Sequence, residues 1–264
     1  MADTGYWRRP GIGDAIVDAL RTSGKNLERL TVDDLAPLDH FHGGGIVATR
    51  ALARMLAPAA DTRVLDVGGG FGGPARLLAA EYRCDVTVLD LTEDYLQAGE
   101  RLTAMARLAE RVRFRHGDAL QLPFGDASFD AVWTQNSGMN IADKPRLYGE
   151  FRRVLRPGGR LATQEPVAGP VQPPHFPLMW ATDASGSFLL DAAALRALIE
   201  SRGFAARAWE VATSPPPQTA SAAPGGTPIQ QLVMGDRLPA ILDANQRNWA
   251  ERRLASAQGV FERG

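Results

Sequence analysis

A glycine-rich turn over residues 64–74, VLDVGGGFGGP, is the segment of this 264-residue chain best suited to bind a nucleotide. An apolar run typical of a buried strand enters the glycines, and a helical pattern leaves them. Glycine tolerates positive φ and lets a ligand approach the main chain, and the start of a helix offers free N–H groups. Gly68, Gly70 and Gly73 satisfy the G-x-G-x-x-G pattern of dinucleotide sites. Asp90 follows Gly68 by 22 residues, which also fits such a site.

Three carboxylates at the ends of successive predicted strands favour a different nucleotide. Asp66 lies inside the first strand, where a dinucleotide-binding strand is usually apolar, and Asp90 and Asp118 end the second and third strands. Open parallel sheets bind ligands at the carboxyl ends of their strands. Carboxylates there suit a cationic nucleoside with a ribose and an adenine better than a pyrophosphate. A nicotinamide-dependent dehydrogenase remains the alternative interpretation.

His40 and His42 are the candidate general bases, because both lie in the turn LDHFHGGG, which cannot be regular helix. Imidazole is the side chain that most often removes a proton near neutral pH. The alternative is that both rings make structural hydrogen bonds that hold the N-terminal segment. His116 is expected to have a structural role, and His175 is expected to lie at the surface.

Five motifs in register, VLDVGGGFGGPAR, VTVLDLT, VRFRHGDALQLPF, FDAVWTQ and EFRRVLRPGGRLA, resemble a class I S-adenosylmethionine-dependent methyltransferase over residues 62–163. The preceding LDHFHGGG and the later FPLMWA resemble small-molecule methyltransferases of the sarcosine/dimethylglycine type and, more distantly, of the tocopherol type. The resemblance implies S-adenosyl-L-methionine as the cofactor and a doubly wound, mostly parallel, seven-stranded α/β sheet.

The resemblance also implies a role for each matching cofactor residue. The backbone of Gly68, Gly70 and Gly72 would face the methionine part of the cofactor, with Asp66 near its ammonium. The other implied contacts are Asp90 with the ribose hydroxyls, Leu91 beside the adenine, Asp118 with the adenine amino group, Ala119 adjacent to it and Gln135 at the sulfonium. For each aspartate, the structural alternative is a helix cap or a turn.

The methyl acceptor is expected between the stretch TQNSGMN and a proline-rich loop at 165–187. The expected acceptor contacts are Asn136, Met139, Asn140, Phe176, Met179 and Trp180, with Tyr6 and Trp7 as further aromatic candidates. Some relatives carry a histidine in the first stretch, and this sequence has none. The expected reaction is N- or O-methylation of a small molecule, with C-methylation open and secondary metabolism as a guess. The rivals are a cyclisation that reuses the cofactor pocket and a non-catalytic binding protein.

The periodicity divides the chain into a helical N-terminal lid (1–60), an α/β core (61–212), a flexible linker (213–228) and C-terminal helices with a last short strand (229–264). Expected strands are 63–67, 85–89, 112–115, 130–133, 160–163, 206–211 and 258–263. Expected helices include 46–56, 74–82, 93–109, 143–155 and 191–202.

Composition excludes several classes of protein. A formal net charge of −1 argues against general binding to nucleic acid or to an anionic membrane, and no apolar run is long enough for a membrane span. The single cysteine, Cys84, excludes an intramolecular disulfide and fits a reducing, cytoplasmic compartment. The histidine spacing gives no metal site. The expected partner is a small-molecule acceptor, and a homo-oligomer stays open.

Overall fold

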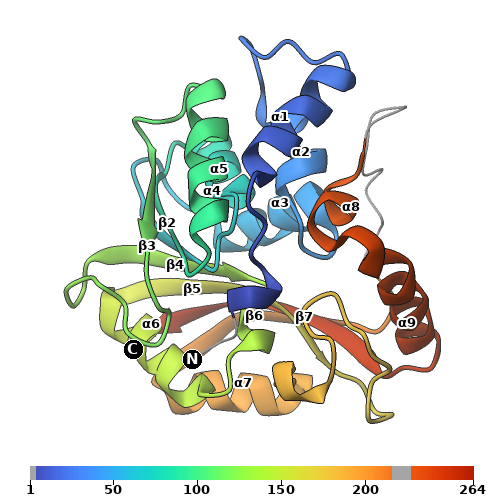
Figure 1. Ribbon diagram of the computed structural model, residues 1–264. Helices are drawn as coiled ribbons and strands as arrows, with labels where there is room; N and C mark the ends of the chain where they lie inside the picture. Colours follow the sequence, from blue (N-terminus) through green and yellow to red (C-terminus); the bar gives the residue numbers. More distant parts are fainter. Residues whose placement is uncertain (1–3, 216–226) are drawn as a thin grey trace.

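The computed structural model describes residues 4–215 and 227–264, and its centre is a seven-stranded sheet (Figure 1). The strands are β1 (Arg63–Val67), β2 (Asp85–Asp90), β3 (Val112–His116), β4 (Phe129–Gln135), β5 (Leu155–Ala168), β6 (Phe204–Ala212) and β7 (Leu254–Arg263). Their order is β3-β2-β1-β4-β5-β7-β6, and β7 runs antiparallel to both β5 and β6. The predicted mostly parallel, doubly wound sheet is confirmed.

Helices cover both faces of this sheet, as Figure 1 shows. One face carries α3 (Gly45–Leu56), α4 (Gly73–Tyr82) and α5 (Glu93–Met105), and the other carries α6 (Lys144–Val154) and α7 (Ala192–Ser201). Successive side chains of a strand point to opposite faces. In β4, Trp133 accordingly packs in the core under α3 and α4, while Val132 packs in the core with α6 and α7.

The N-terminal segment forms the predicted helical layer above the α5 side of the sheet. It contains η1 (Thr4–Tyr6), α1 (Ile12–Thr22) and α2 (Val32–Asp39). The buried face of α1, with Ile16 and Leu20, packs in a core shared with α5 and α8 (Ile229–Met234). Thr31 and Asp34 form a capping box at the start of α2: the Thr31 side chain accepts from the Asp34 N–H, and the Asp34 carboxylate accepts from the Thr31 N–H.

Most predicted strands are too short, and the two largest errors concern the neighbouring strands β5 and β7. β5 continues past residue 163 to Ala168, so the start of the expected loop 165–187 is strand. β7 begins at Leu254, where a helical pattern was expected to reach residue 257. The register pairs Ala168 with Leu254 and Glu165 with Ala257. Cross-strand hydrogen bonding over this stretch outweighs the local helical pattern, because strand pairing depends on tertiary context.

The remaining C-terminal elements are α8, η4 (Gly235–Arg237) and α9 (Leu238–Ala250), with η2 (Gly138–Asn140) and η3 (Ala184–Gly186) elsewhere in the chain. Most of the expected linker 213–228, namely residues 216–226, lies outside the described residues. Within the described ranges, no helix has the length and apolar character needed to cross a bilayer.

Candidate active site

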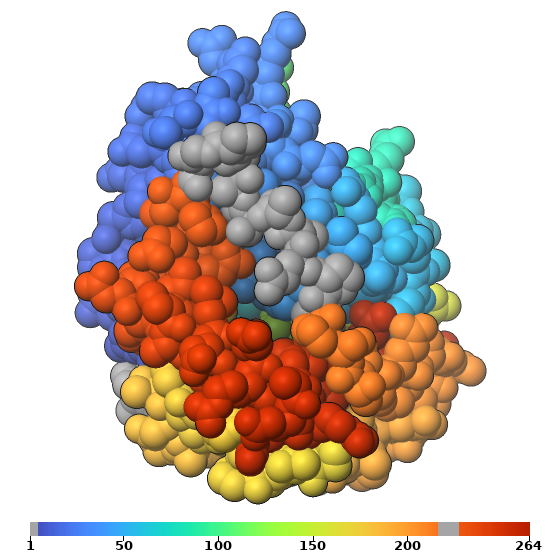
Figure 2. Space-filling model, turned by 90° about the vertical axis from the view of Figure 1, so that its right-hand side faces the viewer, coloured from blue at the N-terminus to red at the C-terminus, as the bar shows by residue number. Residues whose placement is uncertain are grey.

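One large cavity of about 1270 Å³ lies at the carboxyl ends of β1, β2 and β4. Typical small-molecule pockets measure about 300–1,000 Å³, so this one has room for two molecules side by side. The N-terminal segment, η2, the segment after β5 and α9 contribute further walls. On the side of the molecule seen in Figure 2, α8, α9 and the segment near residue 175 come together beneath the N-terminal helices.

The glycine turn between β1 and α4 forms one end of the cavity. Gly68 has φ of 70°, and a Cβ there would stand 2.5 Å from the Cβ of Ser137. A Cβ at Gly69 would lie 2.6 Å from Oδ2 of Asp66. Larger residues are therefore excluded where the turn passes closest to β1 and β4. Gly68 and Gly70 line the cavity; Gly72 does not, and instead caps the start of α4 with φ of 76°.

Asp66 and Asp90 bring two carboxylates to this end of the cavity. The Asp66 side chain is buried, and its Oδ2 has no hydrogen-bond partner among the described residues. Burial, together with the nearby Asp90 carboxylate, raises the pKa of Asp66 to about 8 against the opposing charge of Arg76. A buried polar atom without a partner in a cavity wall indicates a ligand contact.

Asp90 holds the turns on both sides of it. Its Oδ2 accepts from the Gly70 N–H at 2.9 Å, and its Oδ1 accepts from the Thr92 N–H at 2.8 Å. Burial raises the pKa of Asp90, and these two N–H bonds act in the opposite direction. The Thr92 side chain and the Leu91 N–H also act on this carboxylate, and the residue stays partly exposed in the cavity lining. Asp90 thus fixes the glycine turn against β2 while it can still bind hydroxyl groups of a ligand.

Asp118, Ala119 and Leu91 all line the cavity next to Asp90, at the ends of β2 and β3. Asp118 is exposed, and its Oδ1 accepts from the N–H of Leu120 at 2.8 Å. This hydrogen bond forms a turn, which is the structural alternative stated above for Asp118. It leaves the other carboxylate oxygen available to a ligand.

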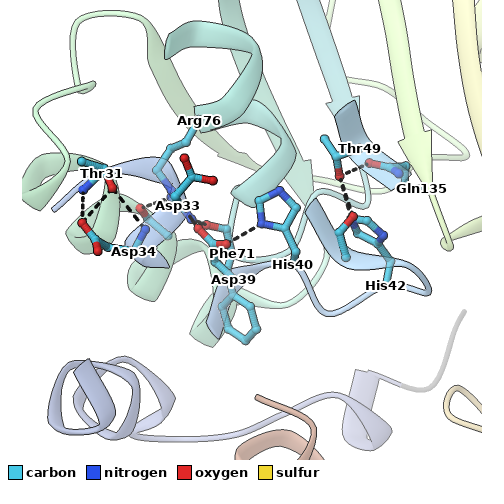
Figure 3. A network of polar contacts seen from close by, with 12 residues as sticks. Thr31, Asp33, Asp34, Asp39, His40, His42, Thr49, Phe71, Arg76 and Gln135 are labelled. Atoms are coloured by element: carbon cyan, nitrogen blue, oxygen red, sulfur yellow. Dashed lines mark hydrogen bonds and ion pairs between the residues drawn. The ribbon is translucent and has the colours of Figure 1, made fainter. Parts of the chain in front are cut away.

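Gln135 lines the cavity at the end of β4, but its amide is largely used by the protein (Figure 3). Its Oε1 accepts from Trp133 Nε1 at 3.0 Å and from Thr49 Oγ1 at 3.2 Å. Its Nε2 donates to Gln164 Oε1 at 2.6 Å. Through these hydrogen bonds, Gln135 connects β4 with β5 and with α3 at the edge of the cavity.

His42 contacts this network through Thr49, as Figure 3 shows, and it is one of the residues that line the cavity. Its Nε2 is 3.0 Å from Thr49 Oγ1 and its Nδ1 is 3.3 Å from the Gly43 carbonyl. Burial, with a smaller effect from His40, lowers the pKa of His42 to about 3. The ring is consequently neutral near pH 7.

His40 has a different surrounding, because its ring is fully buried and tied to α2 and α4. Its Nδ1 lies 2.6 Å from Asp39 Oδ1, and Asp39 Oδ2 accepts from Arg76 Nη2 at 2.8 Å. The three side chains have no exposed surface. Although burial acts to raise the pKa of Asp39, the charges of His40 and Arg76 hold it below its usual value. The contact with Asp39 agrees with the structural alternative for His40. His40 also lines the cavity, and its Nε2 has no partner among the described residues, so the role of a base stays open for it as well.

Five of the six expected acceptor residues line the cavity: Asn136, Met139, Asn140, Met179 and Trp180. Phe176 does not line it and instead packs behind the wall against the cluster that contains Met139 and Trp180. The sequence interpretation missed the contribution of α9, which supplies Leu238, Leu242, Asn245 and Trp249. The apolar periodicity of residues 238–250 was visible, but it does not specify which surface the helix covers.

The sequence interpretation also missed Glu165, which is buried beneath η2. Its Oε1 accepts from the Gly138 N–H at 3.0 Å, and burial raises its pKa to about 7. Lys144 donates its Nζ to the carbonyls of Gly138 and Ile141 at 2.6 and 3.0 Å. These two side chains hold the turn that carries Met139. In the described ranges, no group of three or more His, Cys, Asp or Glu side chains could hold a metal ion.

The strand order, the glycine turn and the carboxylates at the ends of β1, β2 and β3 define a class I methyltransferase fold. Residues 65–163 match the family described as "Methyltransferase domain". This match over part of the chain confirms the resemblance to S-adenosylmethionine-dependent methyltransferases found in the sequence.

Relatives of several kinds share this domain. A glycine/sarcosine/dimethylglycine N-methyltransferase of Actinopolyspora halophila is 39% identical over 108 residues, covering 41% of this chain and 19% of the relative. A 27-O-demethylrifamycin SV methyltransferase of Amycolatopsis mediterranei is 40% identical over 114 residues, covering 43% of this chain and 42% of the relative. The chain thus spans less than half the length of these two relatives. The crystal structure of the 4+2 cyclase SpnF is 23% identical, with a TM-score of 0.67 over 94% of this chain and 93% of SpnF.

Proposed function

We propose that this protein transfers a methyl group from S-adenosyl-L-methionine to nitrogen, oxygen or carbon of a small-molecule acceptor. The observation that carries the proposal is the unpaired, buried Oδ2 of Asp66 beside an open glycine turn in a cavity large enough for cofactor and acceptor. The names of the two relatives from Actinopolyspora halophila and Amycolatopsis mediterranei specify N-methylation and the methylation of a 27-O-demethylated compound. They support methyl transfer as the reaction and leave the receiving atom open.

The lining residues fit the cofactor in polarity and placement. Asp66 suits the ammonium of its methionine part, because an anionic oxygen without a partner gains most from a cationic donor. Asp90 suits the ribose hydroxyls, and Leu91, Asp118 and Ala119 suit the adenine. Gln135 would lie near the sulfonium and keep the end of β4 in place. Gly72 would act indirectly, by supporting the turn from the start of α4.

The cofactor, when bound, supplies a methyl group on a sulfonium that leaves as a neutral thioether. The chain's own task is then to align the acceptor and exclude water. Alignment of this kind can lower a barrier by roughly 7–11 kcal/mol. Met139, Met179 and Trp180 form the apolar wall that would orient the acceptor.

His42 would accept a proton at Nε2, the nitrogen that Thr49 Oγ1 contacts, where the acceptor carries one. It lines the cavity and keeps partial exposure, whereas the His40 ring is fully buried. A pKa near 3 makes His42 a weak base. Its contribution should therefore fall at the low end of the about 10²–10⁴-fold range of general base catalysis. His40 would position the turn that carries His42.

The test combines cofactor binding with product detection. Asp90→Ala should weaken S-adenosylmethionine binding by more than about 1.5 kcal/mol in calorimetry, since ribose hydroxyls would lose their acceptor. Asp18→Ala is the matched control, because Asp18 is exposed and pairs only with Arg21 in the same helix. Unchanged affinity in Asp90→Ala would contradict the assignment. Mass spectrometry should detect S-adenosylhomocysteine once a suitable acceptor is present.

Cyclisation is the second candidate, since the chain shares its fold with a 4+2 cyclase over nearly its whole length and has no histidine in the TQNSGMN stretch. The same mass measurement separates the two. A converted substrate without S-adenosylhomocysteine would favour cyclisation.

A biosynthetic role in the cytoplasm is the finer part of the proposal. Cys84 is buried and unpaired, as expected for a reducing compartment. Assay of the methylated product in cell fractions would test the location.

A further inference from the structure

The cavity continues well beyond the residues assigned to the cofactor. Its other end is lined by Trp7, Met139, Met179, Trp180, Leu238 and Trp249, which come from the N-terminal segment, η2, the segment after β5 and α9. The polar atoms of two aromatic residues at this end are turned toward the protein. Tyr6 Oη donates to the carbonyls of Leu178 and Met179 at 3.2 Å, and Trp180 Nε1 donates to Ser187 Oγ at 3.1 Å. Ring faces and aliphatic groups therefore dominate this end, and the same segments also add uncharged polar side chains such as Asn140 and Asn245.

Among Asp, Glu, Lys and Arg side chains, those that line the described cavity are all aspartates. They are Asp39, Asp66, Asp90, Asp118, Asp143 and Asp183. Every Lys and Arg of the chain lies in its described part, because residues 1–3 and 216–226 contain neither. None of these basic side chains is among the lining residues of that part.

Basic side chains close to the walls are engaged elsewhere. Lys144 is bound to two carbonyls behind η2. Arg76 is buried and uses its donors on Asp39, on Thr103 and on two carbonyls. The Arg237 guanidinium lies over the Tyr6 ring at 4.4 Å from the centroid and outside the cavity lining, and its Nη2 has no hydrogen-bond partner among the described residues.

An anionic acceptor would meet an unfavourable environment here. A carboxylate or phosphate that leaves water needs a cation or several donors to offset its desolvation, and these walls supply mainly carbon. Nearby carboxylates would add repulsion. A large uncharged molecule instead gains from burial against tryptophan, methionine and leucine side chains.

We infer that the acceptor is a bulky, predominantly apolar molecule that carries no carboxylate or phosphate in the cavity. This inference rests on the proposed function and deepens it. It separates this chain from a methyltransferase of glycine, sarcosine or dimethylglycine, whose substrates are small and carry a carboxylate. The likeness to that relative then concerns the cofactor domain and not the acceptor site.

The test compares 2-naphthol with 2-naphthyl phosphate, two probes that share a ring system and differ in charge. Each is titrated calorimetrically into the full chain saturated with S-adenosylhomocysteine, whose own binding is measured first. The naphthol should bind at least about tenfold more tightly than the phosphate, because the phosphate finds no cation in the wall.

A charge variant checks the cause of that preference. Leu242→Lys places an ammonium in the cavity lining at a helix position that is 46% exposed, so the fold should tolerate it. It should shift the affinity ratio toward the phosphate by about threefold or more. Val211→Lys adds the same charge at an equally exposed position outside the cavity and should leave the ratio unchanged.

Each outcome decides the question. A phosphate that binds as well as the naphthol, no measurable binding of the naphthol, or an unchanged ratio in Leu242→Lys would overturn the inference while S-adenosylhomocysteine still binds. Failure of S-adenosylhomocysteine itself to bind would overturn the proposed function and this inference with it.

Discussion

At the scale of single residues, the acids and histidines of the cavity differ in how far the protein already uses them. Asp66 keeps an unpaired oxygen, Asp90 and Asp118 each accept backbone N–H bonds, and His40 is locked to Asp39. The sequence could predict that these residue types gather, because the ends of parallel strands meet at one edge. It could not predict which atoms remain free, because that depends on partners distant along the chain, such as Arg76, which donates to Asp39.

Asp66 should make cofactor binding depend on pH. Its pKa of about 8 means that it is mostly protonated at pH 7 without cofactor, and an ammonium needs the ionised form. Affinity for S-adenosylmethionine should therefore rise from about pH 6 to about pH 7.5, with release of a proton on binding. Calorimetry in two buffers of different ionisation enthalpy measures that proton. Asp66→Asn should bind more weakly and lose the proton release; a variant that still releases it would assign the proton to another group, such as Asp90.

His42→Ala should slow the reaction and leave cofactor affinity nearly unchanged. The ring lines the cavity and contacts Thr49 and Gly43 rather than Asp66 or Asp90, so its loss should not disturb cofactor binding. We expect a fall in kcat of about tenfold to a hundredfold, because the low pKa limits the ring as a base. Steady-state kinetics with calorimetry on the same preparation checks both halves. An unaffected rate would make His42 a structural residue.

At the scale of elements, the predicted strand–helix units agree with the structure where local signals were strong. β1 has the expected bounds, and α4 and α6 differ from prediction by a residue at their ends. The pairing of β5 with β7 was underestimated, because that extension depends on partners about ninety residues apart. The contact between α2 and α4 was also missed. Arg76 looked like an ordinary helical residue, yet it is completely buried.

Arg76 should be an important stabilising contact between the N-terminal helices and the core. Its donors reach Asp39 of α2, the Phe71 carbonyl of the glycine turn, and Gly99 and Thr103 of α5. Removing one partner of a buried ion pair costs about 3–5 kcal/mol, so Arg76→Met should lower the free energy of unfolding by that amount.

Urea denaturation measures this loss, and Arg21→Met is the control. Arg21 pairs with Asp18 on the surface, where such pairs contribute about 0–1 kcal/mol. Equal losses in the two variants would show that the Arg76 contacts add nothing beyond a surface pair.

At the scale of the whole molecule, the cavity is assembled from segments that span the chain. The N-terminal turn, the ends of β1 and β4, the segment after β5 and α9 all contribute walls. The sequence predicted a lid and an acceptor loop, and it placed the C-terminal helices apart from the site. Helical periodicity shows that a helix has an apolar face, but not what that face contacts. Because the walls come from separate segments, a ligand that contacts several of them should stabilise all of these segments against unfolding at the same time.

This linkage should appear as a rise in the thermal midpoint when the cofactor product binds. A ligand that binds only the folded chain adds about 2.7 kcal/mol when its free concentration is a hundred times its Kd. For a chain of this size, each kcal/mol raises Tm by roughly 2–4 °C, so S-adenosylhomocysteine should raise it by roughly 5–10 °C. NAD⁺ at the same concentration should give no shift, because Asp66 places a carboxyl group beneath the glycine turn, where a dinucleotide-binding strand is usually apolar. A scanning fluorescence titration with both ligands decides between them. A shift with NAD⁺ and none with S-adenosylhomocysteine would return the glycine turn to the dinucleotide interpretation. Asp90→Ala should reduce the shift by about half or more, because it weakens the ribose contact by more than about 1.5 kcal/mol.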